Sequence, residues 1–191
     1  MIMRKPDFYR YFMGLRPHPD LCARLAAIAQ QAGQWVRLDM LHLTLCVIAE
    51  PLIRDHFLLP RVQSALAGHS LASFPLRLGR VRGSPKGAML NGLGSQYDIQ
   101  TFYRSLLSLL AARDIEALHR KSGLRPHVTL GYEPSAFEPF KAPIEWFPDE
   151  LLLIESEVGL GRHNIMGRWP LLPPRQSLLP FDTPLLWRAA A

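Results

Sequence analysis

Two short segments of the sequence carry the same combination of side chains that can do acid–base chemistry. Residues 42–45 read HLTL and residues 127–130 read HVTL, so the pattern His-x-Thr-Leu occurs once in each half of the chain. On a β-strand, residues i and i+2 point to the same side. Each copy therefore places an imidazole beside a hydroxyl on one face, while the apolar residues turn to the opposite face and fix the register.

The four polar side chains are suited to chemistry at one phosphate. Near neutral pH, one of His42 and His127 can act as a neutral base while the other acts as a protonated acid. The hydroxyls of Thr44 and Thr129 can donate hydrogen bonds to non-bridging phosphate oxygens. This set suits in-line cleavage of a phosphodiester without a metal, in which the base activates water and the acid protonates the leaving oxygen. From the residues alone, either histidine can take either role.

Other interpretations of the same residues are weaker. A single copy of the motif is typical of a structural histidine, because threonine is common in strands; the recurrence of the whole pattern favours chemistry. A metal site built on His42 and His127 lacks a third ligand at suitable spacing. Cys46 is expected on the same face as His42 and Thr44, but it has no evident partner that would activate a nucleophile.

The elements around the motifs alternate between extended and helical patterns. Apolar alternation and turn residues predict strands, with both motifs opening strands, at 8–15, 35–49, 71–81, 88–93, 127–132, 150–158 and 165–171. Apolar residues at helical spacing predict helices at 20–31, 53–67 and 96–112. The turn before the last strand is expected in GLGRHN, at residues 159–164.

Composition limits the class of protein. The chain has 191 residues, 48% hydrophobic and 20% charged, which is typical of a soluble globular protein with one core. The net charge of +6 favours an anionic partner. No apolar run is long enough to span a membrane, the N-terminus does not read as a secretory signal, and two cysteines are too few for a disulfide framework. We therefore expect a cytoplasmic monomer that forms a single domain over 1–191, with a proline-rich segment at 172–191 that wraps the surface through Phe181 and Trp187.

The two motifs, LHLTL and RPHVTL, resemble those of the 2H phosphoesterase superfamily, and specifically its RNA 2',3'-cyclic phosphodiesterases, long known as 2'-5' RNA ligases. RYFMG at residues 10–14, IES at 154–156 and GRWPL at 167–171 are similar to further segments of that family. The resemblance implies an α+β fold: two antiparallel-sheet lobes, related by pseudo-twofold symmetry, on either side of a central cleft.

The resemblance also implies an activity, the hydrolysis of RNA 2',3'-cyclic phosphate ends to 2'-phosphates. It assigns His42 as the acid, His127 as the base, and Thr44 and Thr129 as the phosphate-binding residues. No metal and no nucleotide cofactor is implied, and 2'-5' ligation is the reverse of a related transesterification. The partners expected are RNA ends or cyclic nucleotides, with no membrane. The alternatives are a 2H phosphodiesterase for another small cyclic phosphate or a 2'-5' oligonucleotide, and a module that binds nucleotides or RNA without turnover.

The sequence departs from the family around the motifs. Tyr132 stands where the family often has an arginine after the second motif, and Asn164 lies near the place of a tyrosine common in the closing hairpin. A tyrosine in place of an arginine exchanges a charge clamp for a stacking surface. Beyond the two motifs, the candidates for substrate contacts are Arg125, Tyr132 and Phe12.

Overall fold

The computed structural model describes residues 5–118 and 123–173. Two four-stranded sheets form the fold, in the orders β2-β1-β7-β8 and β5-β4-β3-β6, and all six strand pairings are antiparallel. The elements are, in chain order, β1 (Phe8–Leu15), α1 (Pro19–Gln31), the 3-10 helix η1 (Leu38–Met40), β2 (Leu43–Ala49), α2 (Leu58–Leu66), β3 (Leu76–Ser84), β4 (Gly87–Gly92), α3 (Tyr97–Ala111), β5 (His127–Gly131), β6 (Phe140–Trp146), β7 (Glu150–Val158) and β8 (Arg162–Pro170).

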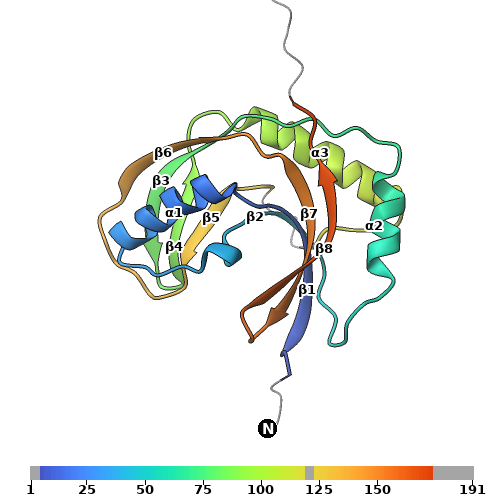
Figure 1. The fold of residues 1–191 in the computed structure, drawn as a ribbon, viewed down its shortest axis with the longest axis horizontal. Coiled ribbons are helices and arrows are strands. Elements are labelled where there is room, and N and C mark those ends of the chain that lie inside the picture. Colours follow the sequence, from blue (N-terminus) through green and yellow to red (C-terminus); the bar gives the residue numbers. More distant parts are fainter. Residues whose placement is uncertain (1–4, 119–122, 174–191) are drawn as a thin grey trace, which may run out of the picture.

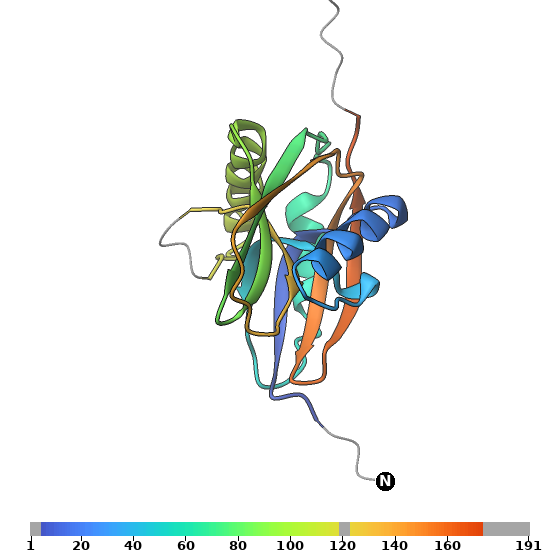
Figure 2. The ribbon, with the colours of Figure 1, turned by 90° about the vertical axis from the view of Figure 1, so that its left-hand side faces the viewer.

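The two sheets form two lobes that meet along their inner edge strands. β2 ends the order of the first sheet and β5 ends the order of the second, and these two strands contact each other. Figure 1 shows the first sheet on the right and the second on the left, and Figure 2 shows the second sheet from its own side. The expected bilobal α+β fold is confirmed. Because each motif belongs to an inner edge strand, the fold brings the two halves of the sequence pattern together.

One continuous hydrophobic core joins the lobes and fixes the register of both motif strands. Leu43 and Leu45 of β2, and Val128 and Leu130 of β5, are at most 4% exposed and belong to the same cluster. The faces opposite these residues are left for His42, Thr44, His127 and Thr129, all of which are partly exposed. The alternation predicted from the sequence therefore has the expected physical cause.

Several element boundaries differ from those expected. The chain at 35–42 is not a strand but leads through η1, so β2 starts only at Leu43. β3 starts at Leu76, directly after Pro75, rather than at residue 71. β6 was not predicted; it contains Pro143 but lies at the edge of its sheet, where a proline is tolerated. Of the proline-rich segment, residues 174–191 lie outside the described residues, so its wrapping and the single domain over 1–191 stay predictions.

Candidate active site

A pocket lies where the two motif strands approach each other. Its volume is about 270 Å³, and its walls include Thr44 and Val47 from β2, His127 from β5, and Arg125 from the segment before β5. One residue of each motif, Thr44 and His127, thus lines this pocket, whereas His42 and Thr129 are not among its lining residues. Thr129 pairs with Met89 of β4 on the same side of the second sheet as His127.

Both histidines are held by the same local contact. Nδ1 of His42 lies 2.7 Å from the carbonyl oxygen of Met40, and Nδ1 of His127 lies 2.9 Å from the carbonyl oxygen of Arg125. Because a carbonyl oxygen only accepts, Nδ1 carries a proton and donates it in both rings. In the neutral rings, Nε2 then carries the lone pair that can accept a proton from a substrate or water. The repeat in sequence is therefore also a repeat in tautomer and ring orientation.

The pKa of His42 lies below its ordinary value. Burial is the main cause, and the charges of Arg16 and His127 act in the same direction, against the hydrogen bond to Met40. Arg16 follows β1, whose last residue Leu15 pairs with Leu43, so its place in the sheet is beside His42. Burial and these charges keep His42 neutral near neutral pH in the empty site.

A third histidine, His163 of β8, packs against His42. The two rings are 4.9 Å apart and nearly perpendicular. Burial and the charge of His42 lower the pKa of His163 to about 4, and its Nδ1 is buried without a hydrogen-bond partner among the described residues. From the sequence, His163 was expected in the turn at residues 159–164, as a weaker candidate than Arg125 for a contact at the mouth of the cleft. Gly159 and Gly161 adopt positive φ values of 86° and 59°, so the turn is short and His163 already lies in the strand.

Phe12 lies beneath these two imidazoles. Its ring is 4.9 Å from that of His42 and 5.6 Å from that of His163, and Phe12 is only 2% exposed. Gly14 makes this arrangement possible, because a Cβ there would lie 3.2 Å from the Phe12 ring and 3.1 Å from the carbonyl oxygen of Leu43. Phe12, a candidate for substrate contact, therefore acts in this structure as a support for His42.

The two threonines have hydroxyls available for a ligand. Thr44 pairs with Gly14 across β1 and β2, and Thr129 pairs with Met89 across β4 and β5. Within residues 5–118 and 123–173, neither hydroxyl makes a hydrogen bond. Both side chains are partly exposed on the faces that carry His42 and His127.

The structure separates the remaining candidates. Arg125 is exposed, lines the pocket and orients His127 through its carbonyl oxygen. Tyr132 is 69% exposed, but it lies beyond the far end of β5, roughly 16 Å along the strand from His127. The side-chain amide of Asn164 donates to Glu155 and Glu157.

Cys46 does not share the face of Thr44. The pairing of β2 with β1 shifts between Gly14–Thr44 and Met13–Cys46, which leaves Leu45 as the extra residue of a β-bulge. Cys46 is 4% exposed and belongs to the main core. The expected common face is wrong at this position, because strict alternation ends at the bulge.

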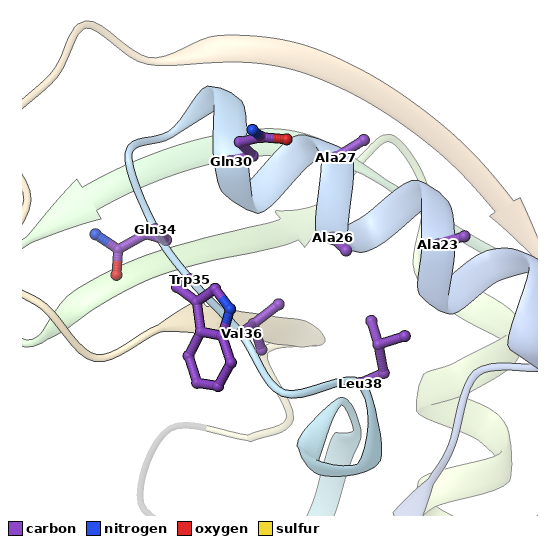
Figure 3. A pocket seen from close by; sticks show the side chains of 8 residues that line it. All are labelled: Ala23, Ala26, Ala27, Gln30, Gln34, Trp35, Val36 and Leu38. Atoms are coloured by element: carbon purple, nitrogen blue, oxygen red, sulfur yellow. The ribbon is translucent and has the colours of Figure 1, made fainter.

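Two further observations concern other kinds of site. No group of three or more His, Cys, Asp or Glu side chains that could hold a metal ion occurs in the described part of the chain. A larger pocket, of about 620 Å³, lies along α1 and includes Trp35 and Leu38. Figure 3 shows that it is lined by alanine, glutamine and apolar side chains, none of which is an acid or a base.

Among the helices of the described residues, none is both long and apolar enough to cross a membrane.

Comparisons with known proteins agree with this geometry. A sequence model of the 2'-5' RNA ligase superfamily matches residues 17–159, which include both motifs. LigT from E. coli, complexed with 3'-AMP, has a similar structure, with a TM-score of 0.67 and 20% identity over 86% of this chain and 98% of LigT. The protein TT0787 of Thermus thermophilus gives a TM-score of 0.66 and 19% identity over 85% of this chain and 97% of its own. A third structure, described as a phosphoesterase, has a TM-score of 0.65 and 19% identity over 88% of this chain and 99% of its own. A search of curated proteins finds no match. At these identities the structural likeness shows the fold.

Proposed function

The chain belongs to the 2'-5' RNA ligase superfamily, and on that premise we propose that it hydrolyses RNA 2',3'-cyclic phosphate ends to 2'-phosphates. The observation that carries the proposal is the matched pair of histidines. Each is fixed through Nδ1 by a carbonyl oxygen two residues earlier. His42 directly precedes β2 and His127 begins β5, the two edge strands that contact each other between the lobes. Two imidazoles with equivalent tautomers, next to the two contacting edge strands, can give and take one proton each.

In the proposed reaction, water replaces the 3'-oxygen at phosphorus. Nε2 of His127 accepts a proton from the attacking water as the new P–O bond forms. The bond from phosphorus to the 3'-oxygen breaks, and His42 donates a proton from Nε2 to that oxygen. The product keeps the phosphate on the 2'-oxygen. His127 then releases its proton to solvent, and His42 takes up a proton from solvent when the next substrate binds. This direction follows the family; the exchanged assignment would leave a phosphate on the 2'-oxygen as well.

The neutral state of His42 in the empty site is compatible with its role as the acid. A phosphodiester carries one negative charge, and an opposite charge at contact distance raises the pKa of an imidazole. Binding of the substrate would therefore raise the pKa of His42 and protonate it, so that it carries a proton for the leaving 3'-oxygen. The hydroxyls of Thr44 and Thr129 would donate to the non-bridging oxygens and stabilise the negative charge that develops there.

The test is the identity of the product. Incubation of the protein with cytidine or adenosine 2',3'-cyclic phosphate, and with an oligoribonucleotide that ends in the same group, is expected to give only 2'-phosphates. Chromatography against 2'- and 3'-phosphate standards distinguishes the products. A 3'-phosphate would overturn the assignment of the leaving group. Binding of these compounds without turnover would identify a binding module, and turnover of other small cyclic phosphates alone would identify a different substrate.

A further inference from the structure

The face of the second sheet that carries His127 continues into a line of polar and basic residues. Across the pairings of β5 with β4, β4 with β3, and β3 with β6, His127 lies opposite Asn91, Asn91 opposite Arg80, and Arg80 opposite Lys141. Directly paired residues of antiparallel strands point to the same side of the sheet. These four side chains therefore form one row, perpendicular to the strands, that starts at the active site and ends at the outer edge.

A second row runs beside the first. Thr129 pairs with Met89, and Met89 pairs with Arg82. The opposite face of the same strands is closed, because Leu90 and Val81 are completely buried in the core. Arg80, Arg82 and Lys141 are all exposed on the side of His127. We call these three residues the basic row.

The basic row differs from several arginines of the two sheets in having no acidic partner. Arg77 pairs with Glu145 on the same sheet, and on the first sheet Arg10 pairs with Glu50 and Arg168 with Glu150. Within the part of the chain that the structure describes, no carboxylate forms an ion pair with Arg80, Arg82 or Lys141. Three positive charges are thus concentrated on an open face beside the pocket.

The basic row lies too far from the pocket to serve the reacting phosphate. Neighbouring strands are about 4.8 Å apart, which places the backbone of Arg80 about 10 Å, and that of Lys141 about 14 Å, from the backbone of His127. A stacked nucleic-acid strand advances about 3.4 Å per nucleotide. The basic row therefore corresponds to phosphates about three to four nucleotides away from the one at His127.

We propose that the basic row binds the backbone of the RNA chain that leads to the reacting 3' end. On this basis the preferred substrate is an oligoribonucleotide of about four or more nucleotides rather than a cyclic mononucleotide. The inference rests on the proposed function, since it takes the cyclic phosphate to lie between His42 and His127. Contacts from arginine and lysine to phosphates carry no base information, so the chain is bound with little preference for sequence.

The test compares a cyclic mononucleotide with an oligoribonucleotide that ends in a 2',3'-cyclic phosphate. The variant R80Q/R82Q/K141Q is expected to lose about tenfold or more in kcat/KM for the oligonucleotide and to keep that for the mononucleotide within twofold. Each contact to a single strand contributes a slope of about −0.7 in a plot of log affinity against log salt. The slope for the oligonucleotide should therefore become shallower by about 2.

A matched control removes the same charge elsewhere. R24Q/R61Q/R104Q changes three exposed arginines, one on each of α1, α2 and α3. It is expected to keep the preference for the oligonucleotide and its salt slope. An equal loss in both triple variants would show that only net charge matters and would overturn the proposal, as would a parallel loss for both substrates in R80Q/R82Q/K141Q.

Binding separates this proposal from the proposed function. An oligoribonucleotide with an unreactive 3'-hydroxyl is titrated into each variant and followed by fluorescence anisotropy. Weaker, less salt-dependent binding in R80Q/R82Q/K141Q alone supports the basic row even if no cyclic phosphate is hydrolysed. Unchanged binding in that variant overturns it even if hydrolysis is found.

Discussion

At the scale of single residues, the site consists of imidazoles whose surroundings set their protonation. His42 rests on Phe12, packs against His163 and donates from Nδ1 to Met40. His127 has the equivalent backbone contact but lies at the second sheet, where Arg125 is exposed. The two histidines therefore share a local backbone contact, and His42 alone packs against two further rings.

Replacing either histidine tests the acid–base pair directly. His42→Ala and His127→Ala should each lower kcat for a 2',3'-cyclic phosphate by about 10²–10⁴-fold, the usual contribution of a positioned acid or base. The measurement is steady-state turnover of each single variant, with thermal unfolding to verify the fold. His56→Ala, which changes an exposed histidine away from the pocket, serves as the control. Near-normal rates in both motif variants would exclude the proposed mechanism.

The pH profile tests the electrostatics of His42. Burial, Arg16 and His127 hold its pKa below the ordinary value, so His42 is the group that titrates at the acid limb of kcat/KM, whichever role it has. Arg16→Gln removes one of the charges that lower this pKa. We expect the midpoint of the acid limb to move upward by about 0.5 pH unit. Arg24→Gln, on the exposed side of α1, should leave the midpoint in place; equal shifts in both variants would contradict the assignment.

At the scale of elements, the apolar alternation of the sequence predicted which segments form the motif strands. The order of the strands and their bulges depend on pairing with other strands and could not be predicted from local pattern. The two motifs were placed on strands correctly because Leu43, Leu45, Val128 and Leu130 all turn into the core. Their meeting at β2 and β5 is a property of strand order, which came from the family resemblance rather than from local pattern. The bulge at Leu45 could not be foreseen, because it is defined by the partner strand β1.

The same distinction limits what the sequence shows about His163 and the basic row. The position of His163 in the structure depends on the length of the turn, since two glycines allow either a long or a short hairpin connection. The basic row is spread over β3 and β6, and β6 was not predicted from the sequence. Its residues become neighbours only through the register of three strands.

The turn between β3 and β4 provides a test at this scale. Gly87 has a φ of 122°, and a Cβ there would lie 2.0 Å from the carbonyl oxygen of Gly131, at the end of β5. Gly87→Ala must therefore displace β5 and should lower the free energy of unfolding by about 3 kcal/mol, from backbone strain together with the steric clash. Gly94→Ala is the control, because its φ is 69° but its Cβ would meet nothing within 4 Å; about 1 kcal/mol is expected there. Urea denaturation measures both, and equal losses would show that the contact with Gly131 does not matter.

At the scale of the whole molecule, one core supports two sheets whose open faces differ. The face of the first sheet around Phe12 forms a small apolar cluster with Leu152 and Ile154 and is covered by imidazoles. The face of the second sheet carries Arg80, Arg82 and Lys141 in the open. The open face of the first sheet is therefore suited to holding the ring of His42 in place, and that of the second sheet is suited to binding an anion. The modest net charge of +6 is consistent with a few phosphate contacts rather than a broad basic surface.

The buried histidines should also make the stability of the molecule depend on pH. The pKa of His163 is lowered from 6.5 to about 4 in the folded state, mainly by burial, and that of His42 is lowered as well. The unfolded chain thus binds more protons than the folded one below pH 6.5, and stability falls as the pH drops toward the folded pKa values. Because His163 is partly exposed, we expect its own share of the loss between pH 7 and pH 4.5 to be about 1–2 kcal/mol.

Replacement of His163 isolates this contribution. His163→Phe keeps an aromatic ring beside His42 and cannot be protonated, so its free energy of unfolding should fall by about 1–2 kcal/mol less than that of the unmodified protein over the same pH range. The changed pKa of Asp39, which Arg37 lowers, is common to both proteins and cancels in the difference. His69→Phe removes an exposed histidine and should keep the full dependence. Chemical denaturation at pH 7 and pH 4.5 gives the comparison, and identical pH dependence in all three proteins would mean that His163 is not held neutral by its position against His42.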